Sequence, residues 1–286
     1  MKWEENARAA VSKLPFAERR KAVARAETAV LKAGRNVVSQ ADIEPLLPKP
    51  PVIGEYESDG YRLEVCSGGN ACPNPAHRKA ENGQTVEGEP ADRLVQGIRA
   101  LLEEADLGGF LRSHGSGPIR VHQLFRVSVS QCPNACSQPQ IRDVGIIAAV
   151  SPVFTEKGCI QCGACENACR ENAVWVDADK ASSVIDHERC VSCGACISVC
   201  PTGRIGKGAS GYRVMIGGKL GRHPRLATEL PEIYDGEAVL RLLFLCLDEY
   251  KQKSTKRKRF ADIVAEEKDS LPGRLAAARH EMKTPG

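Results

Sequence analysis

The cysteines between residues 159 and 200 constrain this chain more than any other feature of its sequence. Two runs share the spacing C-x2-C-x2-C-x3-C: Cys159, Cys162, Cys165 and Cys169, then Cys190, Cys193, Cys196 and Cys200. In each run three thiolates lie on one tight loop, and the fourth follows on a helical turn that points away. We therefore expect the runs to exchange their last members, so that Cys200 joins the first loop and Cys169 joins the second. Gly163 and Gly194 let the backbone fold closely against the sulfurs.

Iron–sulfur clusters explain this spacing better than zinc or disulfides. Zinc rarely uses two interlocked cysteine quartets. Disulfides are rare in reducing compartments, and the N-terminal sequence MKWEENARAAV lacks the apolar stretch of a secretory signal, so we expect a cytoplasmic protein. The runs resemble bacterial-type ferredoxins that carry two 4Fe–4S clusters. One departure is Arg170, which stands where proline usually follows the fourth cysteine, whereas Pro201 keeps the rule.

The bulk composition argues against a membrane-spanning protein and against a nucleic-acid-binding protein. Hydrophobic residues make up 42% of the 286 residues and charged residues 27%, as in a soluble globular protein, and no apolar run reaches membrane-spanning length. The net charge of +4 does not indicate nucleic-acid binding, because thiolate-bound clusters are anionic and would offset it. The basic run at 251–259 has none of the interleaved aromatic residues that nucleic-acid binding would favour, so we interpret it as a solvated helix junction. An alternative is docking of an acidic donor.

Hydrophobic periodicity and breaker residues predict an α+β protein. Helices are expected at 3–11, 17–32, 41–47, 91–104, 236–249 and 259–267. Strands are expected at 61–65, 121–130, 144–150 and 211–218. These elements divide the chain into five parts: a helical module at 1–47, a proline-rich linker at 48–60, a core domain at 61–152 and 208–272, a ferredoxin insertion at 153–207, and a polar tail at 273–286.

The helical module at 1–47 allows two interpretations. Its order of a tryptophan, a helix, Leu-Pro-Phe, a long helix and a short helix resembles the small helical domain of light-independent protochlorophyllide reductase subunits. A generic three-helix docking module explains the same pattern, so the role of this part stays open.

A second set of cysteines lies outside the insertion: Cys66, Cys72, Cys132 and Cys136. They form C-x5-C and, after a long gap, C-x3-C, and each pair follows an expected strand. Two strand ends at one sheet edge would bring all four thiolates to one site. We therefore expect a third 4Fe–4S cluster here, with zinc as the less favoured metal.

The C-x5-C pair followed by CPNxC-x-x-P resembles the cluster motif of the nitrite/sulfite reductase family. The resemblance covers roughly 61–150 and 209–270, and the intervening ferredoxin resembles the insertion of dissimilatory and anaerobic sulfite reductase subunits. It implies a cluster coupled to siroheme, with Cys136 as the axial thiolate of the haem and Asn134 as a neighbouring cofactor contact.

Siroheme carries several carboxylates, so its pocket must supply cations and backbone donors. A basic, glycine-rich loop is the candidate cradle: Gly217, Gly218, Lys219, Gly221, Arg222, His223 and Arg225. A solvated turn explains this loop equally well without the family resemblance. Contact with the carboxylates of siroheme is also a second alternative for the basic run at 251–259. Arg62, Arg78, Lys219 and Arg222 are the candidates for holding a sulfite or nitrite anion.

The sequence thus predicts multi-electron reduction of sulfite or nitrite at siroheme, fed through the ferredoxin by an electron donor protein. Only 65 residues precede Cys66, and the substrate-binding half of full-length family members is not recognisable among them. A partner subunit would complete the site, so we expect an oligomer or a complex. The alternative is a siroheme-free subunit with three clusters that only transfers electrons. Two further expectations are that Cys246 is a buried apolar residue and that Trp175 packs over a cluster.

Overall fold

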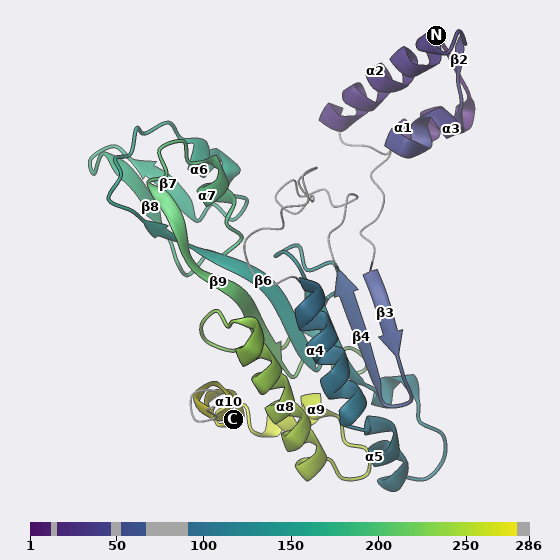
Figure 1. Cartoon of the computed structure of the whole chain (residues 1–286), viewed down its shortest axis with the longest axis vertical. Helices are drawn as coiled ribbons and strands as arrows, with labels where there is room; N and C mark the ends of the chain where they lie inside the picture. The colour runs from purple at the N-terminus through teal and green to yellow at the C-terminus, as the bar shows by residue number, and fades with distance from the viewer. Residues whose placement is uncertain (13–15, 47–52, 67–90, 279–286) are drawn as a thin grey trace. The chain divides into compact units, whose positions relative to one another are not determined.

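The structure is a computed structural model that describes residues 1–12, 16–46, 53–66 and 91–278 (Figure 1). The chain divides into two compact units. The smaller unit lies mainly within residues 1–50, and the larger unit holds the described residues from Ile53 onward. None of the helices described has both the length and the apolar character needed to cross a membrane.

The N-terminal unit combines helices with a small parallel sheet. Its elements are β1 (Lys2–Trp3), α1 (Glu5–Ser12), α2 (Phe16–Lys32), β2 (Val37–Val38), α3 (Gln40–Ile43) and the 3-10 helix η1 (Glu44–Leu46). Its core consists of small and branched apolar side chains: Ala7, Val11, Ala26, Val30, Val38 and Ile43. The first helix begins at Glu5 rather than Trp3, because Trp3 pairs with Val38 in the sheet and donates its indole N–H to Glu27 (3.0 Å).

A six-stranded mixed sheet forms the centre of the larger unit, in the order β10-β9-β6-β5-β4-β3. Its strands are β3 (Ile53–Glu57), β4 (Tyr61–Cys66), β5 (Phe125–Ser130), β6 (Val144–Phe154), β9 (Ile205–Ile216) and β10 (Thr228–Glu229). β4, β5 and β6 are mutually parallel, whereas β3, β9 and β10 pair antiparallel with their neighbours. Helices packed on a mixed sheet confirm the predicted α+β class.

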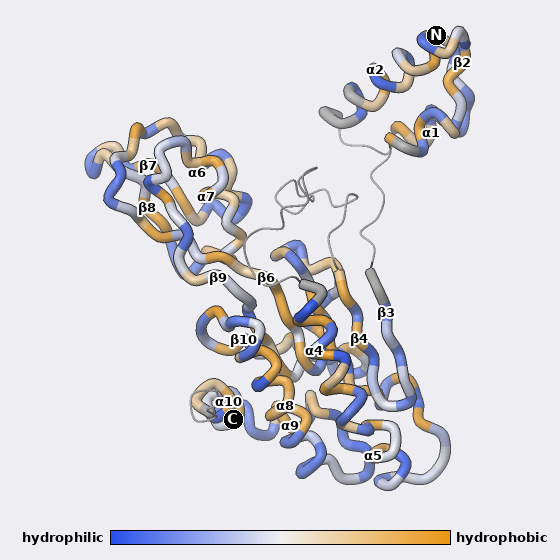
Figure 2. Tube along the Cα trace, viewed as in Figure 1, coloured by the Kyte–Doolittle hydropathy of each residue, from blue (hydrophilic) through white to orange (hydrophobic). Residues whose placement is uncertain are grey.

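Helices cover one face of this sheet (Figure 1). They are α4 (Ala91–Glu104), α5 (Leu107–Ser113), α8 (Gly236–Lys253), α9 (Phe260–Glu266) and α10 (Leu271–Ala278). Alternate strand residues such as Leu63 and Val127 point toward this layer and pack with Ile98 of α4 and Leu243 of α8, all at most 1% exposed. Figure 2 shows the resulting apolar stripe along these elements. Burial of each such side chain contributes about 1.5–3 kcal/mol.

The opposite face of the sheet is polar. Glu64 of β4 points there and accepts a hydrogen bond from Nε of Arg142 (2.6 Å), and both residues are less than 10% exposed. Asp143 is buried beside them and accepts the backbone amides of Arg126 (2.9 Å) and Ala261 (3.2 Å). These bonds attach the start of α9 to the sheet and satisfy carboxylates that would otherwise be costly to bury.

β6 and β9 continue beyond the other strands as a two-stranded ladder. Pairing of β5 with β6 ends at Ser130 and Ile147, but β6 and β9 stay paired as far as Phe154 and Ile205. A bulge between Val150 and Pro152 interrupts the register. The segment between the two strands contains α6 (Ala164–Ala168), β7 (Val174–Asp177), β8 (Ser182–Ile185) and α7 (Ala195–Val199).

The structure corrects the boundaries expected at two ends of the core domain. Residues 53–57, placed in the linker at 48–60, form the edge strand β3, which pairs antiparallel with β4. Residues 273–278, placed in the polar tail at 273–286, belong to α10, whose Leu275 is only 3% exposed. Both errors have one cause: these short segments gain their structure from pairing and packing with distant residues rather than from local periodicity.

The basic run at 251–259 is not a solvated junction, which is a further correction. Arg257 is 8% exposed and donates hydrogen bonds to a row of backbone carbonyl oxygens between residues 111 and 118. Lys253 is held between Glu249 and Glu267, with both Nζ–Oε distances at 2.7 Å. Arg257 therefore connects the end of α8 to the loop after α5.

Candidate functional site

The two cysteine runs of the insertion adopt the same local conformation. Gly163 and Gly194 precede α6 and α7 with φ angles of 70° and 72°, in the left-handed region that favours glycine. Gln161 and Ser192, two residues earlier in each run, also have positive φ angles, of 55° and 52°. Each loop therefore turns tightly around its first two cysteines and enters a helical turn that carries the third.

The structure brings the cysteines together in the exchanged order. One cavity is lined by Cys159, Cys162, Cys165 and Cys200, and the other by Cys190, Cys193, Cys196 and Cys169. Each run thus contributes three cysteines to one cavity and one to the other. No group of three or more His, Cys, Asp or Glu side chains within the described part of the chain is arranged to hold a single metal ion. The role of these cysteines as cluster ligands stays a prediction.

Backbone amides point at several of these sulfurs. The amide of Ala173 donates to Sγ of Cys169 (3.2 Å), and the amide of Ile205 donates to Sγ of Cys200 (3.5 Å). The amide of Gln161 lies 3.4 Å from Sγ of Cys159. Such donors stabilise negative charge on sulfur, as a thiolate ligand requires, and they tune the potential of a bound cluster.

The environment shifts the thiol pKa values in opposite directions. Burial, together with the neighbouring Cys193 and Cys190, raises the pKa of Cys196 to about 11. Burial also raises the pKa of Cys165. For Cys200, burial acts upward, but hydrogen bonds led by the amide of Ile205 outweigh it and lower the pKa. Metal binding at these cavities must therefore displace protons from the buried thiols.

The two cavities differ in their relation to the sheet. The amide of Val150, on β6, donates to the carbonyl oxygen of Ser192 (2.7 Å), and Nη1 of Arg213, on β9, donates to that of Val191 (3.2 Å). Val191 and Pro152 line the cavity of Cys190. The cavity of Cys190 is therefore attached directly to the ladder, whereas Cys162 of the other cavity is exposed to solvent.

The described cysteines of the second set, Cys66, Cys132 and Cys136, lie at or just after the carboxyl ends of the parallel strands β4 and β5. Cys66 ends β4 and is paired in register with Ser130, the last residue of β5, and Cys132 follows two residues later. Cys66 and Cys132 are buried, whereas Cys136 is exposed. Asn134 is exposed on the same loop. Cys72, the remaining candidate ligand, lies outside the described residues.

A serine network holds the loop of Cys132 and Cys136 on the polar face of the sheet. The hydroxyl of Ser137 donates to the carbonyl oxygen of Val129 (3.0 Å) and lies 2.8 Å from the hydroxyl of Ser128 and 2.7 Å from that of Ser130. All three serines are at most 2% exposed. Sequence reasoning missed this network, although serines alternating with valines in RVSVSQ signalled a polar face on a buried strand.

The glycines of the expected siroheme cradle have a packing role. The amides of Gly217 and Gly218 donate to the carbonyl oxygens of Asp143 (2.8 Å) and Arg142 (2.9 Å), so they are not available to an anion. A Cβ atom on Gly218 would lie 2.5 Å from the carbonyl oxygen of Gln140. These positions need glycine because two backbone segments approach closely there. Gly221, with a φ of 108°, has nothing within 4 Å of its Cβ position.

Some basic side chains of this loop already have partners in the protein, and others do not. Nζ of Lys219 pairs with Asp262 at 2.5 Å, and the guanidinium of Arg225 donates to the carbonyl oxygen of Ala261. Within the described part of the chain, Arg222 and His223 are exposed and form no ion pair. The guanidinium of Arg222 and the imidazole of His223 therefore remain available for an anionic ligand.

Of the substrate candidates outside this loop, Arg62 is not free. Arg62 pairs with three carboxylates, with its nearest nitrogens 2.5 Å from Glu55, 3.7 Å from Glu57 and 3.4 Å from Glu64. These neighbours neutralise its charge. Arg78 lies outside the described residues.

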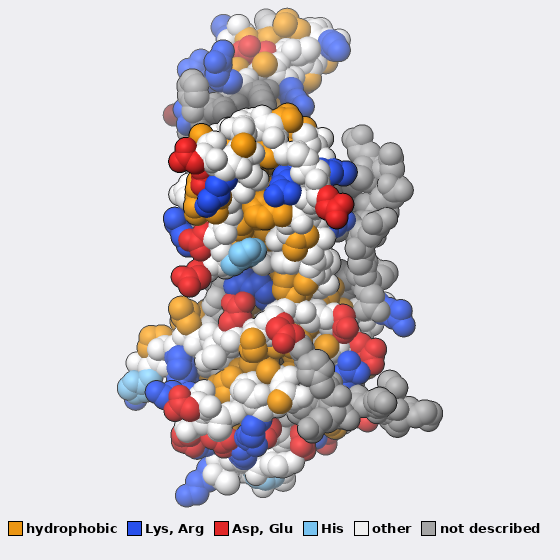
Figure 3. Space-filling view, turned by 90° about the vertical axis from the view of Figure 1, so that its left-hand side faces the viewer, with side chains coloured by type: hydrophobic (Ala, Val, Ile, Leu, Met, Phe, Trp, Pro, Cys, Tyr) orange, Lys and Arg blue, Asp and Glu red, His pale blue; other side chains and the backbone are white. Residues whose placement is uncertain are grey.

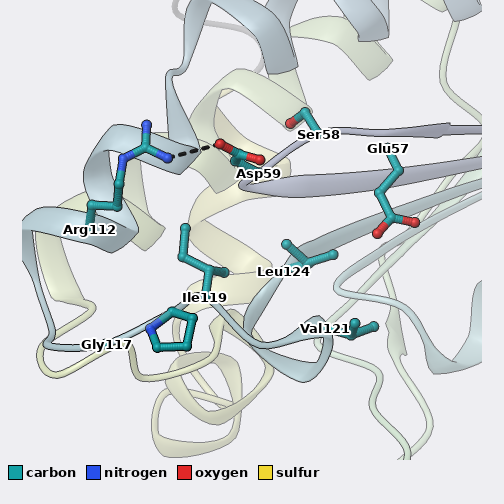
Figure 4. Close-up of a pocket in the computed structure, with 9 residues that line it drawn as sticks. Glu57, Ser58, Asp59, Arg112, Gly117, Ile119, Val121 and Leu124 are labelled. Atoms are coloured by element: carbon teal, nitrogen blue, oxygen red, sulfur yellow. Dashed lines mark hydrogen bonds and ion pairs between the residues drawn. The ribbon is translucent and has the colours of Figure 1, made fainter.

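A separate pocket lies between the turn after β3 and residues 117–124 (Figure 4). An ion pair between Asp59 and Arg112 (3.0 Å) lies at its rim, and Ile119 and Leu124 form its apolar side. This pocket is lined by no cysteine and lies at the start of β4, whereas Cys66 ends that strand. It is therefore separate from the cysteine sites.

Two other expectations have different outcomes. Cys246 is fully buried in the apolar core, as expected, and burial raises its pKa. Trp175 was expected to pack over a cluster, but it is 40% exposed on β7 and lines neither cavity. Its neighbours Val174 and Val176 point toward the cavities instead, because alternate residues of a strand face opposite sides.

Comparison with known proteins supplies the family of this fold. Residues 119–267 match the family described as "Nitrite and sulphite reductase 4Fe-4S domain", which is just over half of the chain. The chain therefore belongs to the nitrite and sulfite reductase family. The matched residues include Cys132 and Cys136 and enclose the whole insertion.

Individual relatives match smaller parts of the chain. The coenzyme F420-dependent sulfite reductase of Methanocaldococcus jannaschii is 41% identical over 98 residues, which is 34% of this chain and 16% of that protein. A subunit of the anaerobic sulfite reductase of Salmonella typhimurium is 46% identical over 43 residues, which is 15% of this chain and 13% of that protein. The chain thus matches less than a fifth of each curated relative. The crystal structure of dissimilatory sulfite reductase I superposes with a TM-score of 0.46 at 12% identity, covering 87% of this chain and 59% of that one.

The packing role of the cradle glycines can be tested with Gly218→Ala. We expect this variant to lower the free energy of unfolding by about 1–3 kcal/mol, because the added methyl group meets backbone atoms that cannot move independently. Gly273→Ala, in α10, is the matched control, since its Cβ would meet nothing within 4 Å. Chemical denaturation measures both. Equal stability of the two variants would contradict the packing role.

Proposed function

We propose that this chain is the iron–sulfur component of an oxidoreductase that reduces sulfite or nitrite by several electrons. The observation that carries the proposal is the position of two cysteine-lined cavities at the ladder of β6 and β9, next to a third set of cysteines that follows the neighbouring strands β4 and β5. Two cavities, each lined by four cysteines, are connected through β6 and β9 to the sheet edge that holds Cys66, Cys132 and Cys136.

The donor sets fit 4Fe–4S clusters. Cys159, Cys162, Cys165 and Cys200 would hold one, and Cys169, Cys190, Cys193 and Cys196 would hold another. Cys66, Cys72, Cys132 and Cys136 would hold the third. When bound, such clusters accept and release single electrons at potentials that the surrounding protein sets.

The chain's own residues prepare these sites in three ways. Amides of Ala173 and Ile205 donate to ligand sulfurs and so favour the thiolate form. The buried side chains of Val174 and Ile205 form a small core with the cysteines and limit the access of water. The hydroxyl of Ser137 fixes the loop that presents Cys136.

Strand β6 passes from the ends of β4 and β5 to the cavity lined by Cys190. Ile147 is paired with Ser130, two residues before Cys132, and Val150 is bonded to the loop of Cys193. Three residues of a strand span about 10 Å. Only this short stretch of β6 lies between the loop of Cys193 and the strand end that precedes Cys132.

Siroheme is part of the proposal, and the described residues fit it only in part. Cys136 is exposed, as a thiolate shared with a haem iron requires, and Arg222 and His223 are available for carboxylates. Lys219 and Arg225 are engaged with Asp262 and the backbone, so the chain supplies few of the cations that siroheme needs. A partner subunit would supply the others.

This need for a partner agrees with what the relatives are called. The Salmonella relative is named as a subunit of an anaerobic sulfite reductase, and this chain matches only a small part of it. We propose that this chain also works in a complex, in the cytoplasm, with an electron donor protein and a second protein that contributes to the substrate site. The small helical unit at 1–47 is a candidate docking module for such a complex.

A second function is an electron-transfer subunit with three clusters and no siroheme. The pairing of Arg62 with three carboxylates and of Lys219 with Asp262 favours this alternative, because it leaves two of the candidate anion-binding side chains already neutralised. The three cysteine sites serve either function.

A visible spectrum separates the two functions. Protein prepared anaerobically from cells that make siroheme is expected to show a Soret band and a red chlorin-type band above the broad iron–sulfur absorbance. Cys136→Ala should remove the haem coupling and leave the absorbance of the two insertion clusters in place. A wild-type spectrum with iron–sulfur absorbance alone would contradict the siroheme proposal and support the electron-transfer function.

The assignment of Cys169 and Cys200 each to the cavity of the other cysteine run can be tested by substitution. In Cys169→Ala, the cysteines at 190, 193 and 196 should become open to alkylation, because they would lose their shared cluster, while Cys159, Cys162, Cys165 and Cys200 stay protected. Cys200→Ala is the matched control and should give the reverse pattern. Mass spectrometry of the alkylated peptides measures both. If Cys169→Ala exposed only its own run, at 159, 162 and 165, the exchanged assignment would be wrong.

A further inference from the structure

The outer end of the insertion carries apolar side chains at its surface. Ile160, between two cysteines of the first run, is 63% exposed, and Phe154, the last residue of β6, is 42% exposed. Pro201, which follows Cys200, is also exposed and lines the first cavity together with Ile160. Figure 3 shows side chains of the hydrophobic colour class, which includes cysteine, exposed on the face that it draws, with Lys and Arg side chains among them.

Cations accompany these apolar residues. Arg204 lies over the Phe154 ring, with its guanidinium carbon 4.9 Å from the ring centroid, and it lines the first cavity. Nζ of Lys157 lies 3.1 Å from the Cβ position of Gly203. Neither cation forms an ion pair with a carboxylate of the described residues. We call Phe154, Lys157, Ile160, Pro201 and Arg204 the outer surface.

Cationic side chains outnumber carboxylates in the segments that form the outer surface. The two segments that form it, 153–163 and 199–207, contain Lys157, Arg204 and Lys207 but a single carboxylate, Glu156. A surface with an apolar centre and a cationic rim is complementary to a partner with an acidic rim around an apolar contact.

The outer surface also lies next to the cavity that contains an exposed cysteine, Cys162. Cys162 of the first cavity is exposed, whereas the second cavity is attached to the sheet through the bond from Val150 to Ser192. A carrier that approaches the insertion therefore meets the first cavity at the surface.

We propose that the outer surface is the docking site for a small acidic electron-carrier protein; this inference rests on the proposed function. One electron would pass from the reduced carrier, which becomes oxidised, to an oxidised cluster held by the first cavity, which becomes reduced. No bond forms or breaks. Ile160 and Phe154 supply the apolar contact, while Lys157 and Arg204 orient the carrier.

A plant-type 2Fe–2S ferredoxin, whose surface is acidic, is a suitable probe. Calorimetric titration of the anaerobic holo-protein with this ferredoxin should give a dissociation constant that rises with ionic strength, because salt screens the opposite charges. Lys157→Glu should raise that constant about fivefold to tenfold, since it replaces an attraction at the rim by a repulsion. Ile160→Ala should also weaken binding, by removing exposed apolar contact area.

Lys268→Glu is the matched control, with the same change of charge at an exposed site that follows α9. It should leave the dissociation constant unchanged. A second readout is the rate at which the ferredoxin, reduced beforehand, bleaches the cluster absorbance. Lys157→Glu should slow this rate by a similar factor, whereas the rate of reduction by reduced methyl viologen, a small molecule, should not change.

The outcomes separate this proposal from the function on which it rests. Equal binding of the ferredoxin by Lys157→Glu and Lys268→Glu, or binding that strengthens with salt, overturns the docking surface while leaving the clusters in place. Absence of cluster absorbance and of its bleaching by methyl viologen overturns the proposed function, and the docking proposal with it.

Discussion

β6 and β9 remain hydrogen-bonded from the centre of the sheet out to Phe154 and Ile205, and this ladder is the constraint on which the larger unit depends. At its inner end it supplies Ile146 and Val214 to the apolar core. At its outer end it holds the insertion through the bond from Val150 to Ser192. Because one pair of strands belongs to both parts, the cavities of the insertion keep a defined distance from the sheet edge.

The two faces of the sheet in the larger unit bury different kinds of side chain. The helical face is apolar and provides the stability of the fold, whereas the opposite face buries the pair of Glu64 and Arg142 and the hydroxyls around Ser137. These polar groups hold the loop of Cys136 and the strand ends in place.

Local spacing made the cysteine sites predictable, since tight loops, glycines with positive φ and short helices are determined by residues a few positions apart. The structure places around each cavity the same cysteines that the spacing groups. Contacts between distant segments were not predictable in this way. Residues 53–57 became a strand only through pairing with β4, and Arg257, interpreted as solvated, is buried among carbonyl oxygens more than 130 residues away in sequence. The basic loop after β9 contains the expected glycines, but Gly217 and Gly218 serve packing.

The most direct test of this account is anomalous diffraction at the iron edge from crystals of the anaerobically prepared protein. The account predicts two compact iron sites in the insertion, one bonded to Cys159, Cys162, Cys165 and Cys200, and the other to Cys190, Cys193, Cys196 and Cys169. A metal site bonded to all four cysteines of a single run, or a zinc signal in place of iron, would contradict it.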